Sequence, residues 1–288
     1  MHCKKALLIL WASLAAASDF SGVSALKFTA DAVNFGPRPP GSAAIHKFQQ
    51  YILSTLKGCR CEVSEDSFTA LTPRGAIGMT NIIARFRGGS GRAVAFTGHY
   101  DTKLFPNFRF VGANDGGSSA GFLLEMARVL AGKPRKDDVY LVWFDGEESF
   151  GQWSATDGIY GSRHLARRWA ADGTAKRLKA LINVDMIGDK DLGIIKESNS
   201  SPSLGRLVWQ VAADLGYRSH FLDEAMAVED DHAPFLRIGV PALDLIDFDY
   251  GPGNSWWHTS QDTMDKVSSE SLLIVGDVLL ETLRRLEQ

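Results

Sequence analysis

Two adjacent glutamates, Glu147 and Glu148, follow an apolar run at residues 139–144 after a short Asp-Gly step. A short unbroken apolar run bounded by polar residues is typical of a buried parallel strand. Adjacent carboxylates at a strand end point in different directions, so one can bind a metal while the other transfers protons. An isolated Asp-Gly-Glu-Glu turn is more often a solvated loop. Here the predicted buried strand before the turn and the large Trp153 after it favour a catalytic or metal-binding role for the two glutamates.

Two further side chains, Asp115 and His258, are of types that bind zinc together with Glu148. Asp115 lies in the glycine-rich segment 112–118, which can turn a carboxylate inward; the alternative is an aspartate that caps the following helix. His258 follows Trp257 in a loop. One Asp, one Glu and one His leave the fourth position of a tetrahedral zinc open, as a catalytic site requires. We therefore interpret the three as ligands of a catalytic zinc.

Two more carboxylates, Asp185 and Asp230, are candidates for the same site. Asp185 follows the apolar run 180–184, and Asp230 begins an Asp-Asp-His stretch ahead of a short helical segment at 233–237. Taken alone, Asp230 also fits an acidic helix cap. Carboxyl groups crowded around Glu147 cannot all ionise readily, so at least one pKa is raised. A carboxyl group in that state is a usable acid and base.

The elements that must position these residues alternate between strand-like and helix-like runs. This alternation predicts a single α/β domain with a central, mostly parallel mixed sheet covered by helices on both faces. Expected strands lie at 93–96, 139–144, 180–184 and 240–246, and expected helices at 42–58, 122–130 and 268–286. Because α/β sheets bind ligands beyond the carboxyl ends of their strands, His99, Asp145 and Asp185 should border one pocket. Pro241 favours a strand start or an edge position.

The N-terminus predicts export. Two lysines precede an apolar stretch from Ala6 to Ala17, and small residues continue to Ala25, a pattern typical of a signal peptide. A membrane span needs roughly 20 apolar residues, more than this stretch has. We expect residues 1–25 to be removed, leaving a secreted or periplasmic catalytic domain at 26–288 with no other membrane association. With 31 basic and 34 acidic residues and no long run of either sign, the charge argues against nucleic acid as a partner.

Longer strings around these residues resemble the animal-type glutaminyl-peptide cyclotransferases, or glutaminyl cyclases, which share the fold of zinc aminopeptidases. The strings are TGHYDTK from Thr97, FDGEESFGQW from Phe144, YGSRHLA from Tyr160, DDHAPFLRIGVP from Asp230 and WHT from Trp257. Their order and spacing hold from about Pro37 to the C-terminus. The Glu-Glu pair followed by Trp153 and YGSRHLA is specific to the cyclases rather than to the aminopeptidases.

The resemblance implies an enzyme that closes the N-terminal glutamine of peptides or proteins into pyroglutamate with release of ammonia. It implies one zinc ion on Asp115, Glu148 and His258, proton transfer by Glu147 with support from Asp185 and Asp230, and a glutamine pocket walled by Trp153 and Trp257. We expect the enzyme to act as a monomer. The resemblance also implies a cis peptide bond after Asp115.

The sequence departs from the animal cyclases in two respects. A disulfide of theirs corresponds to Gly98 and Ala120, so that bridge is absent, and a pocket histidine of theirs falls on Asp244. The first change should affect stability more than chemistry, and the second could alter substrate preference or pH range. Cys59 and Cys61 are compatible either with a strained bridge or with two free thiols.

Two other functions use parts of the same pattern. A di-zinc aminopeptidase would bind its metals with His99, Asp115, Glu148, Asp185 and His258 and would use Glu147 to activate a bridging water. A catalytically silent binding module on this fold would usually have lost some of these ligands, and here all are present. The Trp153 and YGSRHLA pattern, with Trp257 before the metal histidine, favours the cyclase over the aminopeptidase, and the complete set of ligands argues against the binding module.

Overall fold

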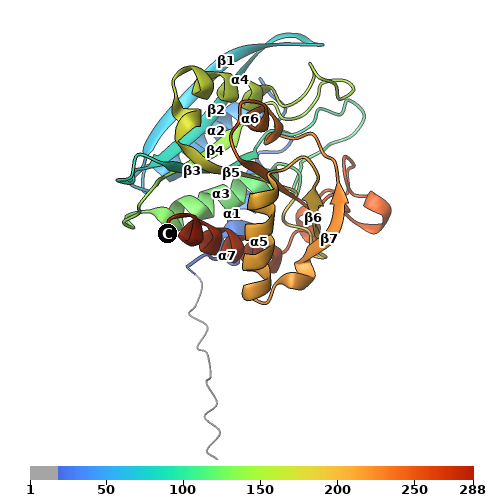
Figure 1. Cartoon of the computed structure of the whole chain (residues 1–288). Coiled ribbons are helices and arrows are strands. Elements are labelled where there is room, and N and C mark those ends of the chain that lie inside the picture. Colours follow the sequence, from blue (N-terminus) through green and yellow to red (C-terminus); the bar gives the residue numbers. More distant parts are fainter. Residues whose placement is uncertain (1–18) are drawn as a thin grey trace, which may run out of the picture.

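The computed structural model describes residues 19–288, and an eight-stranded sheet runs through its centre (Figure 1). The strands are β1 (Glu62–Thr72), β2 (Gly75–Phe86), β3 (Ala93–His99), β4 (Asp138–Phe144), β5 (Leu178–Asp185), β6 (Ile194–Glu197), β7 (Phe221–Met226) and β8 (Ala242–Ile246). They lie in the order β1-β2-β4-β3-β5-β8-β6-β7. Strands β4, β3, β5 and β8 are parallel, and β1–β2, β2–β4 and β6–β8 are antiparallel pairs. The predicted α/β fold is confirmed.

The central strands form at the short apolar runs of the sequence. Every residue of β3 and of β4 is buried, because helices cover both faces of the sheet and neither face is left for polar side chains. Strand β8 begins directly after Pro241 and pairs with β5 on one side and β6 on the other. Pro241 therefore marks a strand start, one of its two expected positions, in the interior of the sheet.

The helices divide by the face of the sheet that they cover. They are α1 (Gly22–Asn34), α2 (Ala43–Leu56), α3 (Gly117–Leu130), α4 (Tyr160–Ala171), α5 (Pro202–Asp214), α6 (Ala233–Arg237) and α7 (Ser269–Leu286). Side chains of α1, α2, α3, α5 and α7 join the larger core, and those of α4 and α6 pack on the opposite face, which is the upper face in Figure 1. Among the described residues, no helix has both the length and the apolarity to cross a bilayer.

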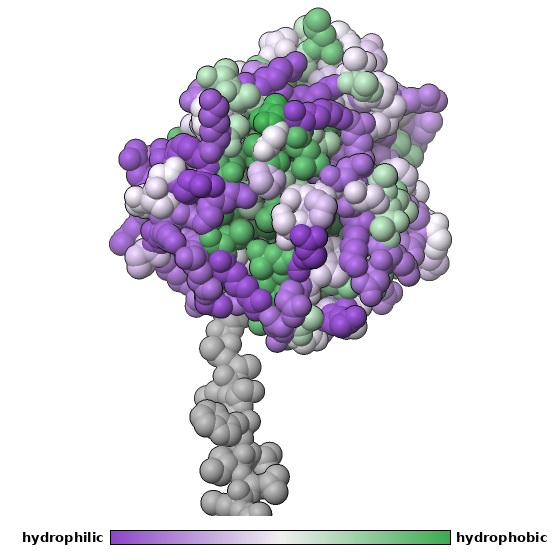
Figure 2. All heavy atoms as spheres, in the orientation of Figure 1, coloured by the Kyte–Doolittle hydropathy of each residue, from purple (hydrophilic) through white to green (hydrophobic). Residues whose placement is uncertain are grey.

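Local sequence explains where these helices begin. Ser42 and Ser268, the residues before α2 and α7, accept backbone N–H bonds from the first turn of each helix, which is how an N-cap serine stabilises a helix start. The apolar stripe of each helix then faces the sheet, and hydrophilic side chains cover much of the face that Figure 2 shows.

Residues of chemical interest gather at the carboxyl ends of the parallel strands. His99 ends β3, Asp185 ends β5, and Glu147 and Glu148 follow β4. Because β3 lies between β4 and β5, the three strand ends are neighbours, and their side chains can meet at one edge of the sheet.

The first of the two departures from the animal cyclases leaves no disulfide between β3 and α3. A Cβ on Gly98 would lie 2.7 Å from both the Ser119 Cβ and the Val184 carbonyl oxygen, so β3 and α3 are in close contact there. Ala120 is fully buried in the same region. Cys59 and Cys61 are both free thiols, which decides between the two alternatives left open by the sequence.

The first described residues are tied to the body of the protein. Phe20 is 2% exposed and packs on Phe122 with ring centroids 5.1 Å apart. The Ser21 amide donates to Glu125 Oε1 at 2.8 Å. Ala25, the expected last residue of the signal peptide, is fully buried within α1. The remainder of that predicted segment, residues 1–18, lies outside the described residues.

Replacing Phe20 by alanine should lower the free energy of unfolding by about 3–5 kcal/mol, because the lost ring leaves a cavity against α3 and α7. Val23→Ala is a matched control, since Val23 is 73% exposed; its effect should stay within about 0.5 kcal/mol. Equilibrium denaturant unfolding of both variants beside the parent measures the difference. Equal stability of all three proteins would show that this segment is not part of the folded core.

Candidate active site

Three side chains from distant parts of the chain converge as a possible metal site. Asp115, Glu148 and His258 each offer one ligand atom, and these atoms lie within 4.8 Å of one another. His258 Nε2 is 3.2 Å from Asp115 Oδ2 and 3.2 Å from Glu148 Oε1. The structure thus brings together the three residues that the sequence analysis proposed as zinc ligands.

Asp115 is held by the backbone so that its carboxylate is free for this site. Helix α3 begins after Gly116, which has φ +79°, and has no side-chain cap. The backbone amides of Asn114 and Asp115 instead donate to Asp262 at 2.8 and 3.1 Å. Asp115 is therefore not the helix cap that local sequence also permitted.

The expected cis peptide bond after Asp115 is wrong for this structure, because all peptide bonds among residues 19–288 are trans. The next residue, Gly116, has a left-handed backbone conformation, which is open to glycine at little cost.

His258 is fixed by aromatic rings on two sides. Its backbone is left-handed, with φ +54°, which is uncommon for a residue with a side chain. The ring of Trp257 stacks on the imidazole at 4.1 Å and 18°. Phe105 and Phe110 meet it edge-on at 5.7 and 5.9 Å. These contacts leave Nε2 directed at the two carboxylates.

Asp101 positions both glutamates, a role that the sequence analysis did not assign. Its carboxylate accepts the backbone N–H groups of Glu147 at 3.1 Å and of Glu148 at 3.3 Å. It also lies 3.4 Å from His99 Nδ1. A signal was available in the sequence, because Asp101 is two residues beyond His99 and can share its side of the chain at the strand end.

Glu147, Asp185 and Asp230 all border one cavity with the metal triad. Burial raises the pKa of Glu147 well above its usual range, with His99 opposing the shift and Glu148 and Asp230 adding to it. Burial likewise raises the pKa of Asp185 to about 7, against the lowering effect of His99. The crowding of carboxyl groups expected from the sequence is present, and the pKa values of Glu147 and Asp185 are raised, as expected.

His99 forms a second group of possible ligands that shares Asp115 with the first. His99 Nε2 lies 3.2 Å from Asp115 Oδ1 and 3.1 Å from Asp185 Oδ1. The three ligand atoms again fall within 4.8 Å of one another. The carboxylate of Asp115 thus presents one oxygen to each group, as a bridging ligand would.

The cavity beside the triad has a volume of about 430 Å³. Its wall includes Trp153 and Trp257, the two aromatics proposed from the sequence, together with Phe248. Phe248 packs on Trp257 with ring centroids 5.0 Å apart. Trp153 is 40% exposed, so it stands at the mouth rather than in the core.

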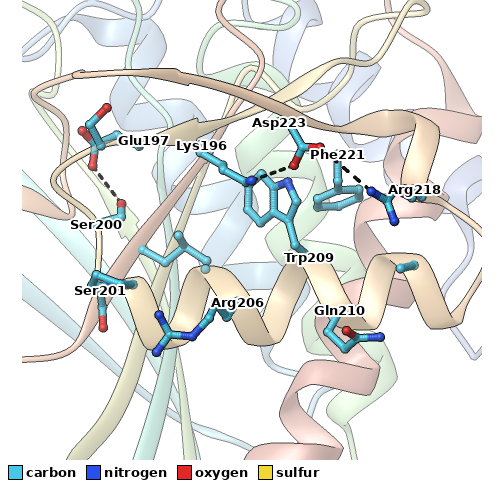
Figure 3. Close-up of a pocket in the computed structure, with 15 residues that line it drawn as sticks. Lys196, Glu197, Ser200, Ser201, Arg206, Trp209, Gln210, Arg218, Phe221 and Asp223 are labelled. Atoms are coloured by element: carbon cyan, nitrogen blue, oxygen red, sulfur yellow. Dashed lines mark hydrogen bonds and ion pairs between the residues drawn. The ribbon is translucent and has the colours of Figure 1, made fainter.

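A second cavity of about 480 Å³ lies along α5, β6 and β7 (Figure 3). Trp209 and Phe221 form its apolar part, and Lys196 pairs with Asp223 across it at 2.7 Å. None of the proposed catalytic or metal-binding residues lines this cavity.

The donor set of the first group suits zinc. It combines one imidazole nitrogen with carboxylate oxygens, a mixture that zinc accepts. Asp115 Oδ2 is buried and, apart from its 3.2 Å contact with His258 Nε2, has no hydrogen-bond partner. Although burial alone would lower the pKa of His258, Glu148 and Asp115 raise it to about 10. The site thus carries an excess of negative charge that a divalent cation would neutralise.

Comparison with known proteins defines the class first. The model of Peptidase family M28 matches residues 81–283, which include every ligand candidate named above. The chain therefore belongs to peptidase family M28.

Individual relatives narrow the class. The glutaminyl-peptide cyclotransferase of Drosophila melanogaster is 31% identical over 268 residues, covering 83% of this chain and 75% of the relative. The crystal structure of an Acidobacteriales bacterium glutaminyl cyclase is 40% identical, with a TM-score of 0.90 and 99% coverage of both chains. A Zn-dependent exopeptidase from Parabacteroides distasonis is 28% identical, with a TM-score of 0.82 and coverage of 93% and 99%. Within the family, the chain groups with the glutaminyl-peptide cyclotransferases.

Replacing His258 by alanine should weaken zinc binding more than about a hundredfold. Loss of a residue that only hydrogen-bonds to a metal ligand lowers metal affinity by roughly 10–100-fold, and loss of a ligand itself should cost more. His46→Ala is the control, because His46 is exposed on α2. The zinc-to-protein ratio after dialysis against a chelator of known affinity measures the change. Full zinc retention by His258→Ala would remove His258 from the ligands.

Proposed function

We propose that this enzyme converts the N-terminal glutamine of peptides to pyroglutamate and releases ammonia, using one zinc ion. The observation that carries the proposal is the shared cavity, in which the buried Glu147 lies beside the triad of Asp115, Glu148 and His258. In the reaction, the α-amine nitrogen forms a bond to the γ-carbonyl carbon and the bond from that carbon to the amide nitrogen breaks.

Asp115, Glu148 and His258 would hold the zinc ion, which when bound polarises the γ-carbonyl oxygen. Glu148 can serve this role because Lys103 and the Asp101 contact to its backbone fix its position. One ion is the simplest occupancy, since Asp115 is shared and the buried His99 already contacts three carboxylates. A zinc-to-protein ratio near two in the parent would contradict it.

Glu147 would accept the proton from the attacking amine and return it to the departing ammonia. A residue in this role must be stable both with and without its proton, and the raised pKa of Glu147 favours that. Asp185 and Asp230 border the cavity next to it and would hold its carboxyl group in place.

Trp153 and Trp257 would wall the pocket for the glutamine side chain. Enclosure by aromatic surface holds the amine and the amide carbon in reacting geometry and keeps water away, which favours ring closure over hydrolysis. A related site that admitted water next to Glu147 would favour peptide hydrolysis instead.

A peptide assay tests the activity directly. A glutamine-initiated peptide should lose the mass of one ammonia molecule, while matched alanine- and leucine-initiated peptides should stay intact. Release of the first amino acid would indicate an aminopeptidase, and inertness towards all three peptides would indicate a binding protein.

The variant Glu147→Gln should lose at least about a hundredfold in kcat, because an amide cannot exchange the proton. Its zinc-to-protein ratio should match that of the parent. Loss of zinc from this variant would mean that Glu147 and Glu148 have exchanged roles.

We also propose that the protein is exported, with its leader ending ahead of Asp19 rather than after Ala25. Cleavage after Ala25 would remove the buried Phe20 together with Ser21 and would cut α1 within its first turn, at the buried Ala25. The stretch Ala15-Ala16-Ala17 has the small residues that signal peptidase prefers. The intact mass of protein recovered from the medium or periplasm should correspond to a chain that retains Phe20; a chain beginning at Leu26 would contradict this.

A further inference from the structure

Asp230 is connected to a buried polar network on the side away from the cavity. Asn183 Nδ2 donates to Asp230 Oδ2 at 3.0 Å and to Asp244 Oδ1 at 3.0 Å. The side-chain oxygen of Asn183, Oδ1, accepts a hydrogen bond from the Thr97 hydroxyl at 2.8 Å. This bond fixes the orientation of the Asn183 side-chain amide. All four residues are at most 2% exposed. The two N–H groups of one amide thus link the proposed support of Glu147 to an aspartate deeper in the protein.

Asp244 in turn faces a histidine whose other nitrogen is already engaged. His232 Nε2 is 3.1 Å from Glu197 Oε2, and His232 Nδ1 is 3.9 Å from Asp244 Oδ2. Neither Nδ1 nor Oδ2 has a hydrogen-bond partner. His232 and Asp244 are both fully buried, so bulk water does not supply the missing hydrogen bonds.

Glu197 fixes which nitrogen of His232 carries a proton. Its carboxylate accepts bonds from the Asn199 and Val228 amides and from the Ser200 hydroxyl, and Figure 3 shows the Glu197–Ser200 bond at the edge of the second cavity. Burial alone would raise the pKa of Glu197, but His232 and these donors lower it to about 2. An ionised carboxylate can only accept hydrogen bonds, so His232 Nε2 must be the donor in its bond to Glu197.

The remaining question is whether Asp244 is charged. Asp230, Asp185 and Glu197 are the acidic groups around it, and His232 is the basic one. Three acidic neighbours and complete burial disfavour a further anion at this position. A neutral carboxylic acid can accept from Asn183 through one oxygen and carry its O–H on the other, on the side of His232 Nδ1.

We propose that Asp244 is a positioning residue that acts as a neutral acid. Paired with a neutral His232, it takes one N–H of Asn183 and thereby keeps the other N–H directed at Asp230, which supports Glu147. The proposal rests on the proposed function for its effect on catalysis, but the protonation state of His232 does not depend on that function. The position that corresponds to a pocket histidine of the animal cyclases is thus occupied here by an aspartate of a buried polar network.

Kinetics of two substitutions test the role. Asp244→Leu leaves one N–H of Asn183 without its partner, and kcat for a glutamine-initiated peptide should fall by about 10–100-fold through misplacement of Asp230. KM and zinc content should stay within about twofold, because neither the pocket wall nor the ligands are touched. Asp244→Asn has the shape and hydrogen-bonding pattern of the neutral acid and should retain at least about half of the kcat.

Asp247→Asn is the matched control. Asp247 is an equally buried aspartate just beyond β8 that bonds to the Gly193 amide at 2.8 Å and not to Asn183. Its kcat should stay within about twofold of the parent. If Asp244→Asn falls as far as Asp244→Leu, Asp244 acts as an anion and the proposal is wrong; if neither falls, Asp244 positions nothing.

Nitrogen chemical shifts of His232 provide a test on the unmodified chain. In protein labelled with ¹⁵N-histidine, with the signals assigned by a His232→Gln variant, the ring should be neutral and protonated on Nε2 at pH 7. A cationic ring would overturn the neutral-acid assignment, even if a substituted protein failed to fold. An absence of any cyclisation by the parent would overturn the proposed function and leave this spectroscopic result to decide the state of the network.

Discussion

The carboxylate of Asp115 lies between two imidazoles, with His258 on one oxygen and His99 on the other. This arrangement depends on the backbone of the loop before α3. The carboxylate of Asp262 accepts the backbone N–H groups of Asn114 and Asp115, and the Asp115 side chain does not cap α3 and stays free for the site. Both groups of candidate metal ligands include Asp115. A change in the direction of this one side chain would therefore disperse the whole site.

The carboxyl groups around Asp115 are tolerated because most of them have a specific donor. Asp101 receives the amides of both glutamates, and Asp230 receives the amide of Asn183. Buried anions without such partners are expensive. Asp115 Oδ2 and Asp244 Oδ2 are among the buried carboxylate oxygens that lack a hydrogen-bond partner. The first lies where a cation would bind, and the second faces His232 Nδ1 at 3.9 Å.

Much of the scaffold follows from patterns within short stretches of sequence. The apolar runs at β3, β4, β5 and β8 and the serine caps of α2 and α7 are all where local rules place them. Parallel strands put their carboxyl ends at one edge, so the meeting of His99, Asp185 and the two glutamates could be predicted without knowing the loops. The boundary after Ala25 was expected from small residues alone, and local sequence could not reveal that Ala25 is buried within α1.

The sequence by itself determined the fold class, the strand ends that carry carboxylates and the residue types of the proposed zinc site, because hydrophobic periodicity and strand polarity are local properties. Only the tertiary structure decided which way Asp115 points, that Asp101 holds both glutamates, and that Phe248 joins Trp257 at the cavity. It also placed Asp244 beside His232 and Asn183. These contacts join residues from separate segments whose relative positions depend on the packing of the whole domain, so no short stretch of sequence contains them.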